Sequence, residues 1–101
     1  MSPVVGISVI TPKPGVFDQF MELQLAQLNR LRGKVAGVRG SRLYRARDGR
    51  SVVLVAVFET AEDQKRFSES AVLQEHLARI RPLVEPAGAI LYETVYEVGE
   101  V

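Results

Sequence analysis

The stretch that most constrains the fold is SVVLVAVF, residues 51–58, which has no polar side chain between Ser51 and Glu59. A half-buried strand alternates apolar and polar side chains, but this one would be apolar on both faces. One face carries Val52, Leu54, Ala56 and Phe58, and the other carries Val53, Val55 and Val57. The sequence therefore requires a cover over each face of the sheet that contains this strand.

The rest of the chain alternates between strand and helix patterns. β-branched runs and period-two alternation predict strands over 4–11, 38–47, 51–58 and 88–98. Asp48-Gly49 predicts a tight hairpin turn between the second and third strands. Apolar spacing predicts a helix over about 15–32, carrying Phe17, Phe20, Met21, Leu28 and Leu31 on one side. A second helix begins after Thr60, breaks near Ser68–Ser70, resumes at Ala71 and ends near Pro82 or Pro86.

The element order β-α-β-β-α-β predicts an α+β fold of the ferredoxin-like type, an antiparallel four-stranded sheet with both helices on one face. The opposite face would stay bare, and Val5, Ile7 and Val9 would add to it. An exposed apolar sheet face is an association surface, so we expect a homodimer through this face. The alternative is a monomer with a partly wet apolar strand.

Size and charge set further bounds. A chain of 101 residues predicts a single domain over 1–101. A formal net charge of +1 gives no electrostatic reason to expect nucleic acid or membrane as a partner. With no cysteine and one histidine, we expect no metal site. The first ten residues lack a signal-peptide pattern, and no apolar run approaches membrane-spanning length, so we expect a cytoplasmic protein.

Several short segments, in their order and spacing, resemble the antibiotic biosynthesis monooxygenase family of the dimeric α+β barrel superfamily. The segments are Thr11-Pro-Lys-Pro-Gly15, Gly37 with Leu43-Tyr44-Arg45, Val57-Phe58-Glu59 with Glu62-Asp63, and Ser70 with His76. The resemblance covers nearly the whole chain. It implies a pocket between the sheet and the helices, and a cofactor-independent monooxygenase, with no cofactor expected. The implied substrate is a small aromatic molecule of the quinol type.

The family's functional residues transfer only in part. The haem-degrading branch has Asn, Trp and His at positions that match Ser8, Phe67 and His76. The polyketide-oxidising branch often has Asn and Trp at positions that match Leu54 and Phe58. Leu and Phe cannot donate the hydrogen bonds that an amide or an indole offers to an oxyanion.

We name His76 as the candidate catalytic residue and five residues as candidate substrate contacts: Ser8, Gln24, Phe58, Phe67 and Tyr92. His76 would serve as a general base or acid, or as an axial ligand; alternatively it is a boundary histidine with one nitrogen in water. Small side chains at Gly6 and Ser8 would leave room for a cavity, unless a helix packs closely over the glycine. Gln24 lies within an apolar stripe and needs a partner, either a ligand or a protein group.

The strand over 38–47 and its turn are rich in arginine, at positions 39, 42, 45, 47 and 50. These charges would either recognise an anionic ligand or keep an edge strand from pairing with other chains. Two alternatives to the monooxygenase remain: a dimeric small-molecule-binding or interaction protein without catalysis, and a haem-binding or haem-degrading protein.

Overall fold

The computed structural model describes residues 3–100. Its elements in chain order are β1 (Val4–Ile10), α1 (Phe17–Leu31), β2 (Val38–Arg45), β3 (Val52–Phe58), α2 (Ala61–Ser68), α3 (Ala71–Ile80), the 3₁₀ turn η1 (Arg81–Leu83) and β4 (Ile90–Tyr92). The predicted ferredoxin-like order is confirmed, with the second helix divided into α2 and α3 where the sequence predicts a break. No helix in the described part of the chain is long and apolar enough to cross a membrane.

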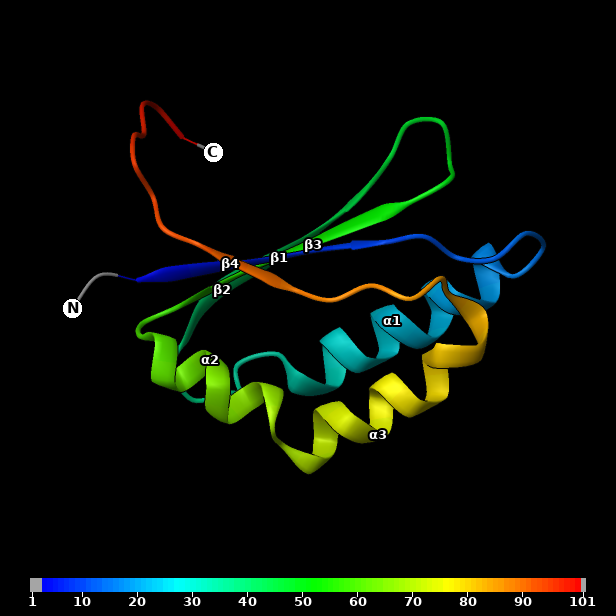
Figure 1. Ribbon diagram of the computed structural model, residues 1–101, viewed down its shortest axis with the longest axis horizontal. Helices are drawn as coiled ribbons and strands as arrows, with labels where there is room; N and C mark the ends of the chain where they lie inside the picture. Colours follow the sequence, from blue (N-terminus) through cyan, green and yellow to red (C-terminus); the bar gives the residue numbers. More distant parts are fainter. Residues whose placement is uncertain (1–2, 101) are drawn as a thin grey trace.

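The four strands form one antiparallel sheet in the order β2-β3-β1-β4, and the helices lie against one face of it (Figure 1). Gly6 pairs with Ala56 and Ile7 pairs with Val55 in the centre of the sheet. Because side chains alternate between faces, this register places the even-numbered residues of β1 and β3 on one face and the odd-numbered residues on the other. The helix-side face is the even-numbered one, which carries the buried residues Ile10, Val52 and Phe58.

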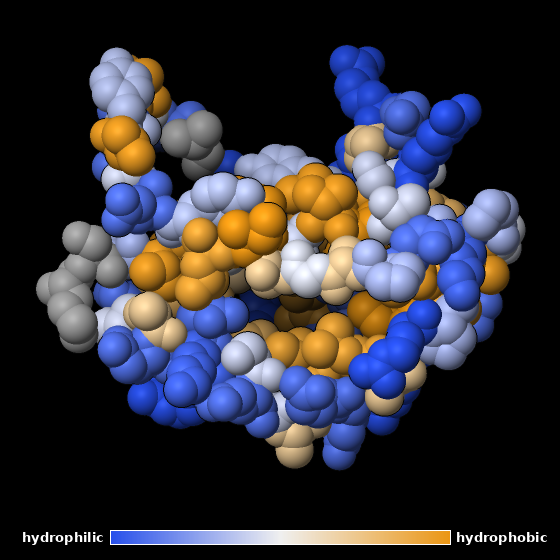
Figure 2. All heavy atoms as spheres, in the orientation of Figure 1, coloured by the Kyte–Doolittle hydropathy of each residue, from blue (hydrophilic) through white to orange (hydrophobic). Residues whose placement is uncertain are grey.

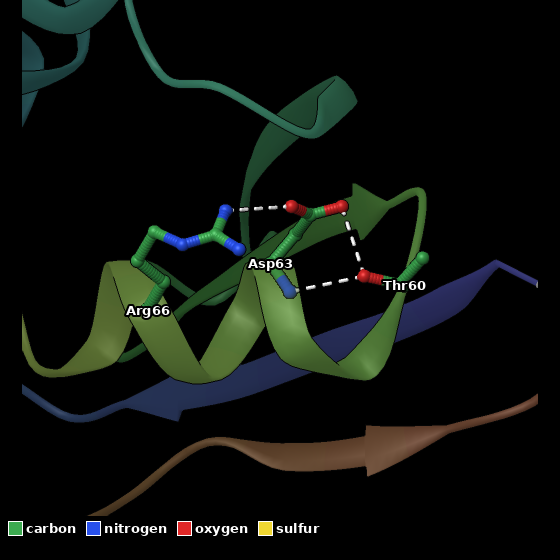
Figure 3. A network of polar contacts seen from close by, with 3 residues as sticks. All are labelled: Thr60, Asp63 and Arg66. Carbon is green, nitrogen blue, oxygen red and sulfur yellow. Dashed lines mark hydrogen bonds and ion pairs between the residues drawn. The ribbon is translucent and has the colours of Figure 1, made fainter.

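The start of α2 is fixed by a polar network of three residues (Figure 3). The Asp63 backbone N–H donates to Thr60 Oγ1 (3.1 Å), and the same hydroxyl donates to Asp63 Oδ2 (2.9 Å). Arg66 Nη1 donates to Asp63 Oδ1 (2.8 Å). These hydrogen bonds, that from Thr60 first and that from Arg66 second, lower the pKa of the Asp63 carboxyl. The predicted Thr60 cap is therefore present, and an ion pair supports it.

Gly37 allows the chain to pass beside this network. Its φ of +83° lies in the left-handed region, and a Cβ there would collide with the Asp63 side chain. Its carbonyl accepts a hydrogen bond from the Glu59 N–H (2.8 Å), which ties the start of β2 to the end of β3. A larger residue at Gly37 would therefore disturb both the turn and the α2 cap.

The helix-covered core has two separate parts. One is the buried cluster Ile10, Phe20, Val52 and Ile80, where α1 and α3 meet the sheet. The other is at the opposite end of β3, where the rings of Phe58 and Phe67 lie 6.1 Å apart, within the range of favourable aromatic contact. Val52 and Phe58 are six residues apart along β3, which is roughly 20 Å of strand. The core is therefore split along the length of the sheet.

The last strand is much shorter than the sequence predicts. Alternation predicts a strand over 88–98, but only Ile90–Tyr92 pair with β1. Tyr92 pairs with Val5, so continuing the register would bring the chain to Val4, the first residue of β1, and then to Pro3, which has no amide hydrogen. Beyond Val4, β1 therefore offers the residues after Tyr92 no further strand residue to pair with.

Candidate active site

A cavity of about 620 Å³ lies between the two parts of the core, with the sheet on one side and α2 and α3 on the other. Figure 2 shows the hollow between the layers, with apolar residues around its mouth. Its walls combine apolar residues with a few polar ones: Gly6, Ser8, Ile10, Gln24, Leu54, Ala56, Phe58, Gln64, Phe67, Ser68, Leu73, His76, Leu77, Ile80, Arg81, and residues 84–89. This volume lies within the range of sites that bind small molecules.

Small side chains on the sheet create the space. Gly6 pairs with Ala56 and Ser8 pairs with Leu54, and all four line the cavity. A Cβ at Gly6 would meet only Leu91 and the Ala56 carbonyl, at ordinary contact distances of 3.7 and 3.8 Å. No helix atom therefore packs against this glycine, and the room above it belongs to the cavity.

His76 and Gln24 form a buried polar pair in the cavity wall. They come from α3 and α1, and each side chain is nearly inaccessible, with 4% and 3% of its surface exposed. His76 Nε2 and Gln24 Oε1 are 2.8 Å apart. Since the amide oxygen only accepts, Nε2 carries the hydrogen and donates it. Gln24 thereby fixes the orientation and the tautomer of the imidazole ring.

The other ring nitrogen of His76, Nδ1, faces different surroundings. It has no hydrogen-bond partner among residues 3–100. Burial lowers the pKa of His76, and the positive charges of Arg79 and Arg30 lower it further. The ring is therefore neutral near pH 7, and Nδ1 presents a lone pair that can take a proton.

Gln27, one turn beyond Gln24 on α1, is also buried, but only one end of its amide has a hydrogen-bond partner. Its Oε1 accepts from Arg30 Nη1 (3.0 Å). Its Nε2 is the one fully buried side-chain nitrogen or oxygen in the described chain that has no partner. Gln27 does not line the cavity, so it adds no group to the site itself.

The aromatic end of the cavity is held by α2. Phe67 contacts Phe58 from this helix, and Gln64 and Ser68 line the same wall. The short helix is fixed at its start by Thr60 and at its end by the Ser70 hydroxyl, which donates to the Phe67 carbonyl (2.6 Å). An amide and two aromatic rings therefore lie close together, as an aromatic ligand with polar substituents would require.

The structure brings five of the six predicted site residues to one cavity: Ser8, Gln24, Phe58, Phe67 and His76. It does not bring Tyr92 there. The pairing of Tyr92 with Val5 sets it on the opposite face of the sheet, where it is exposed. The alternation of side chains along the last strand could not show which of its faces lines the cavity, because both faces of that segment are partly apolar.

Part of the cavity wall is not among the residues predicted from the sequence. Gln64 lies three residues before Phe67 and four before Ser68 on α2, and this helical spacing was a usable signal. Arg81, Glu85 and the segment 86–89 close the side next to β4. This segment has no periodicity that would predict a wall. Among residues 3–100, no three His, Asp or Glu side chains gather into a group able to hold a metal ion.

The comparisons with known proteins agree with this geometry. Residues 3–79 match the family model of the antibiotic biosynthesis monooxygenases. The chain belongs to the antibiotic biosynthesis monooxygenase family. A search of curated proteins finds no match.

Solved structures share the fold over almost the whole chain. SnoaB, a cofactor-independent oxygenase from Streptomyces nogalater whose mutant has been solved, is 19% identical, with a TM-score of 0.85 over 99% of this chain and 100% of its own. Rv0793 from Mycobacterium tuberculosis is 22% identical, with a TM-score of 0.84 over 97% of this chain and 100% of its own. Protein SO0527 from Shewanella oneidensis is 20% identical, with a TM-score of 0.81 over 92% of this chain and 91% of its own.

Proposed function

We propose that this protein is a monooxygenase that needs no cofactor and oxidises a small aromatic substrate of the quinol type in the cavity between sheet and helices. The observation that carries the proposal is the buried His76 in the wall of a largely apolar cavity, held by Gln24 through Nε2 and with no hydrogen-bond partner at Nδ1 among residues 3–100. Membership of the family and the likeness to SnoaB support the same reaction class.

The proposed reaction converts a quinol and dioxygen into a hydroxyquinone and water. His76 Nδ1 takes a hydroxyl proton, and the electron-rich ring anion reduces dioxygen and forms a C–O bond at a neighbouring ring carbon. The proton returns from His76 to the peroxide. The O–O bond then breaks with loss of hydroxide and the ring C–H proton, so one oxygen atom stays on the ring and the other leaves as water.

The surroundings of His76 affect its two proton steps differently. A phenol has a pKa of about 10, well above that of histidine, so the first transfer is uphill in water. The Ser8 hydroxyl and the Gln24 and Gln64 amides line the cavity and offer donors to the anion. Burial and the positive charges of Arg79 and Arg30 disfavour the imidazolium, which makes the first transfer harder and the return of the proton easier.

The test is oxygen uptake with a naphthoquinol, corrected for uncatalysed autoxidation, in the wild type, His76→Ala and His76→Gln. We expect both substitutions to reduce kcat by about 100-fold or more, the usual size of a lost general base. With ¹⁸O-labelled dioxygen, one labelled atom should enter the product. Catalysed uptake that is unchanged in both variants would remove His76 from the mechanism, and no uptake above background in the wild type would reject the monooxygenase.

One observation favours a second candidate, a protein that binds an aromatic ligand without turnover. On the sheet side the cavity presents Leu54 and Phe58 of β3, which carry no hydrogen-bonding side-chain group. Saturable quenching by a quinone with no product formed from the matching quinol would support this role. Measurable turnover of a bound compound would reject it.

We also propose that two copies join through the bare face of the sheet to form a dimeric α+β barrel. Val9, Tyr44, Ile90 and Tyr92 are exposed on this face, beside the half-buried valines of β3. Exposed apolar surface of this extent on a sheet is a typical association surface. A second copy would give β3 the cover that the helices give its other face.

A further inference from the structure

The contact between Gln24 and His76 joins two buried polar side chains that are 52 residues apart in the chain. Gln24 comes from α1 and His76 from α3, and both line the cavity. A neutral histidine carries its single ring hydrogen on one of two nitrogens, and the other nitrogen is the one with a free lone pair. The partner of one nitrogen therefore decides which nitrogen is left for a ligand.

We propose that Gln24 is a positioning residue: it selects the nitrogen of His76 that meets the substrate, and its lack of charge lets His76 act as a base down to mildly acidic pH. This inference rests on the proposed monooxygenase and assigns to its site a residue that acts through another. Gln24 Oε1 lies 2.8 Å from His76 Nε2, and an amide oxygen only accepts, so the ring hydrogen is held at Nε2. The nitrogen that can take a proton is then Nδ1.

The amide at position 24 differs from a carboxylate in charge and not in shape. Glutamate would accept the same hydrogen bond, but its negative charge beside the ring would favour the imidazolium. An imidazolium carries hydrogen on both nitrogens and cannot take a proton from a substrate. Glutamine orients the ring without adding a charge that would hold a proton on it. Gln24 thus keeps the orientation of His76 separate from its protonation.

The charged groups near the ring leave it without a counter-charge. Burial first, and then the positive charges of Arg79 on α3 and Arg30 on α1, lower the pKa of His76. Arg81 and Glu85 line the cavity from the segment after α3, with one charge of each sign. No carboxylate among residues 3–100 forms an ion pair with the ring. The nearest polar partner of His76 is therefore the neutral amide, and the ring stays able to accept a proton below neutral pH.

Gln27 offers a matched control on the same helix. It lies one turn beyond Gln24 and is buried almost as fully. It does not line the cavity, and its Oε1 accepts from Arg30 rather than from the histidine. Leucine at either position removes a buried amide from α1, but only Gln24→Leu removes the partner of His76.

The first test is ¹⁵N NMR of the imidazole, which has one set of signals because the chain has one histidine. In the wild type we expect the hydrogen on Nε2. Gln24→Leu should give a mixture of the two tautomers, whereas Gln27→Leu should keep the wild-type form. Gln24→Glu should keep the hydrogen on Nε2 and raise the ratio of imidazolium to neutral ring at pH 7 about tenfold or more.

Two results of this test would overturn the inference. One is a wild type that carries the hydrogen on Nδ1. The other is Gln24→Glu with the protonation of the wild type. This variant keeps the size of the side chain and its acceptor, so the second result can be obtained even where Gln24→Leu does not fold.

The second test is the pH profile of kcat/KM for oxygen uptake with the naphthoquinol, corrected for autoxidation. Gln24→Leu should lower kcat/KM about tenfold or more at every pH, because the ring loses its orientation. Gln24→Glu should lose activity at pH 7 and recover it at higher pH, where its ring is neutral and still oriented. Gln27→Leu should follow the wild type.

A loss in Gln24→Glu that is the same at every pH would overturn the role of charge. Full activity in Gln24→Leu would overturn the role of orientation. A wild type without turnover would reject the proposed monooxygenase instead, and the NMR titration would still decide how Gln24 acts on His76.

Discussion

Both faces of β3 are apolar, but helices cover only one of them. On the helix side, Val52 and Phe58 are buried at the two ends of the strand, while Leu54 and Ala56 between them border the cavity. On the other side, Val53, Val55 and Val57 are each half-buried, and no element within residues 3–100 covers them. The apolar residues of the first face pack against the helices and border the cavity. We infer that those of the second face pack against another chain.

The largest expected effect on stability comes from a substitution in the buried cluster on the helix side. Phe20 is fully buried in the cluster with Ile10, Val52 and Ile80. Phe20→Ala removes a large ring and leaves a void, so we expect the free energy of unfolding to fall by about 4 kcal/mol. Urea denaturation at a fixed protomer concentration measures it. Leu25→Ala, on the exposed side of the same helix, should cost less than about 0.5 kcal/mol. Similar losses in both variants would refute the placement of the core.

The bare face is tested by a charge at its centre. Val55 pairs with Ile7 across the middle of the sheet. Val55→Asp would bury an unpaired carboxylate between two sheets, so we expect the dimer to weaken by about 3 kcal/mol, or roughly a hundredfold in its dissociation constant. Sedimentation equilibrium measures this, with Leu25→Asp as the control. An unchanged constant would mean that this face is not the interface.

A third prediction concerns the cavity on the helix side, which we propose binds the substrate. Ala56→Leu adds three carbons into the open space beside Gly6 and Ser8. We expect quinone affinity to fall about tenfold or more, while the free energy of unfolding changes by less than about 1.5 kcal/mol. Fluorescence titration and urea denaturation measure the two effects. Full affinity in this variant would place the ligand elsewhere.

Much of this arrangement could be predicted from local sequence patterns. The β-branched runs over 4–11 and 51–58 predicted two strands of the sheet. Asp48-Gly49 predicted the hairpin, and Ser68–Ser70 predicted the break between α2 and α3, because turn and cap chemistry depends on neighbouring residues. The end of the last strand could not be predicted in the same way. Glu93–Val98 has the alternation of a strand, but whether it is paired depends on where β1 begins, a contact distant in sequence.

The candidate site shows the same limit. Helical spacing could place His76 and Gln24 near apolar faces of their own helices, but it could not show that α1 and α3 set them 2.8 Å apart. The pairing of Gly6 with Ala56, which opens the cavity, is likewise a matter of register between strands 50 residues apart. The chemistry of its side chain suggests a ligand contact for Tyr92, whereas the register sets it on the other face of the sheet.

The smallest expected effect concerns the protonation of His76 and distinguishes a buried neutral histidine from one in water. Burial, with Arg79 and Arg30, lowers its pKa below the value of 6.5 that an unfolded chain would show. As the pH falls below about 6.5 the unfolded state binds the proton first, so the folded state loses relative stability, by at most ~1.4 kcal/mol per pH unit. Above this range the contribution is constant. Urea denaturation from pH 8 to 5 should show a steeper loss for the wild type than for His76→Gln, which cannot titrate. Parallel curves would place the histidine in water and remove the physical basis for a neutral base at this site.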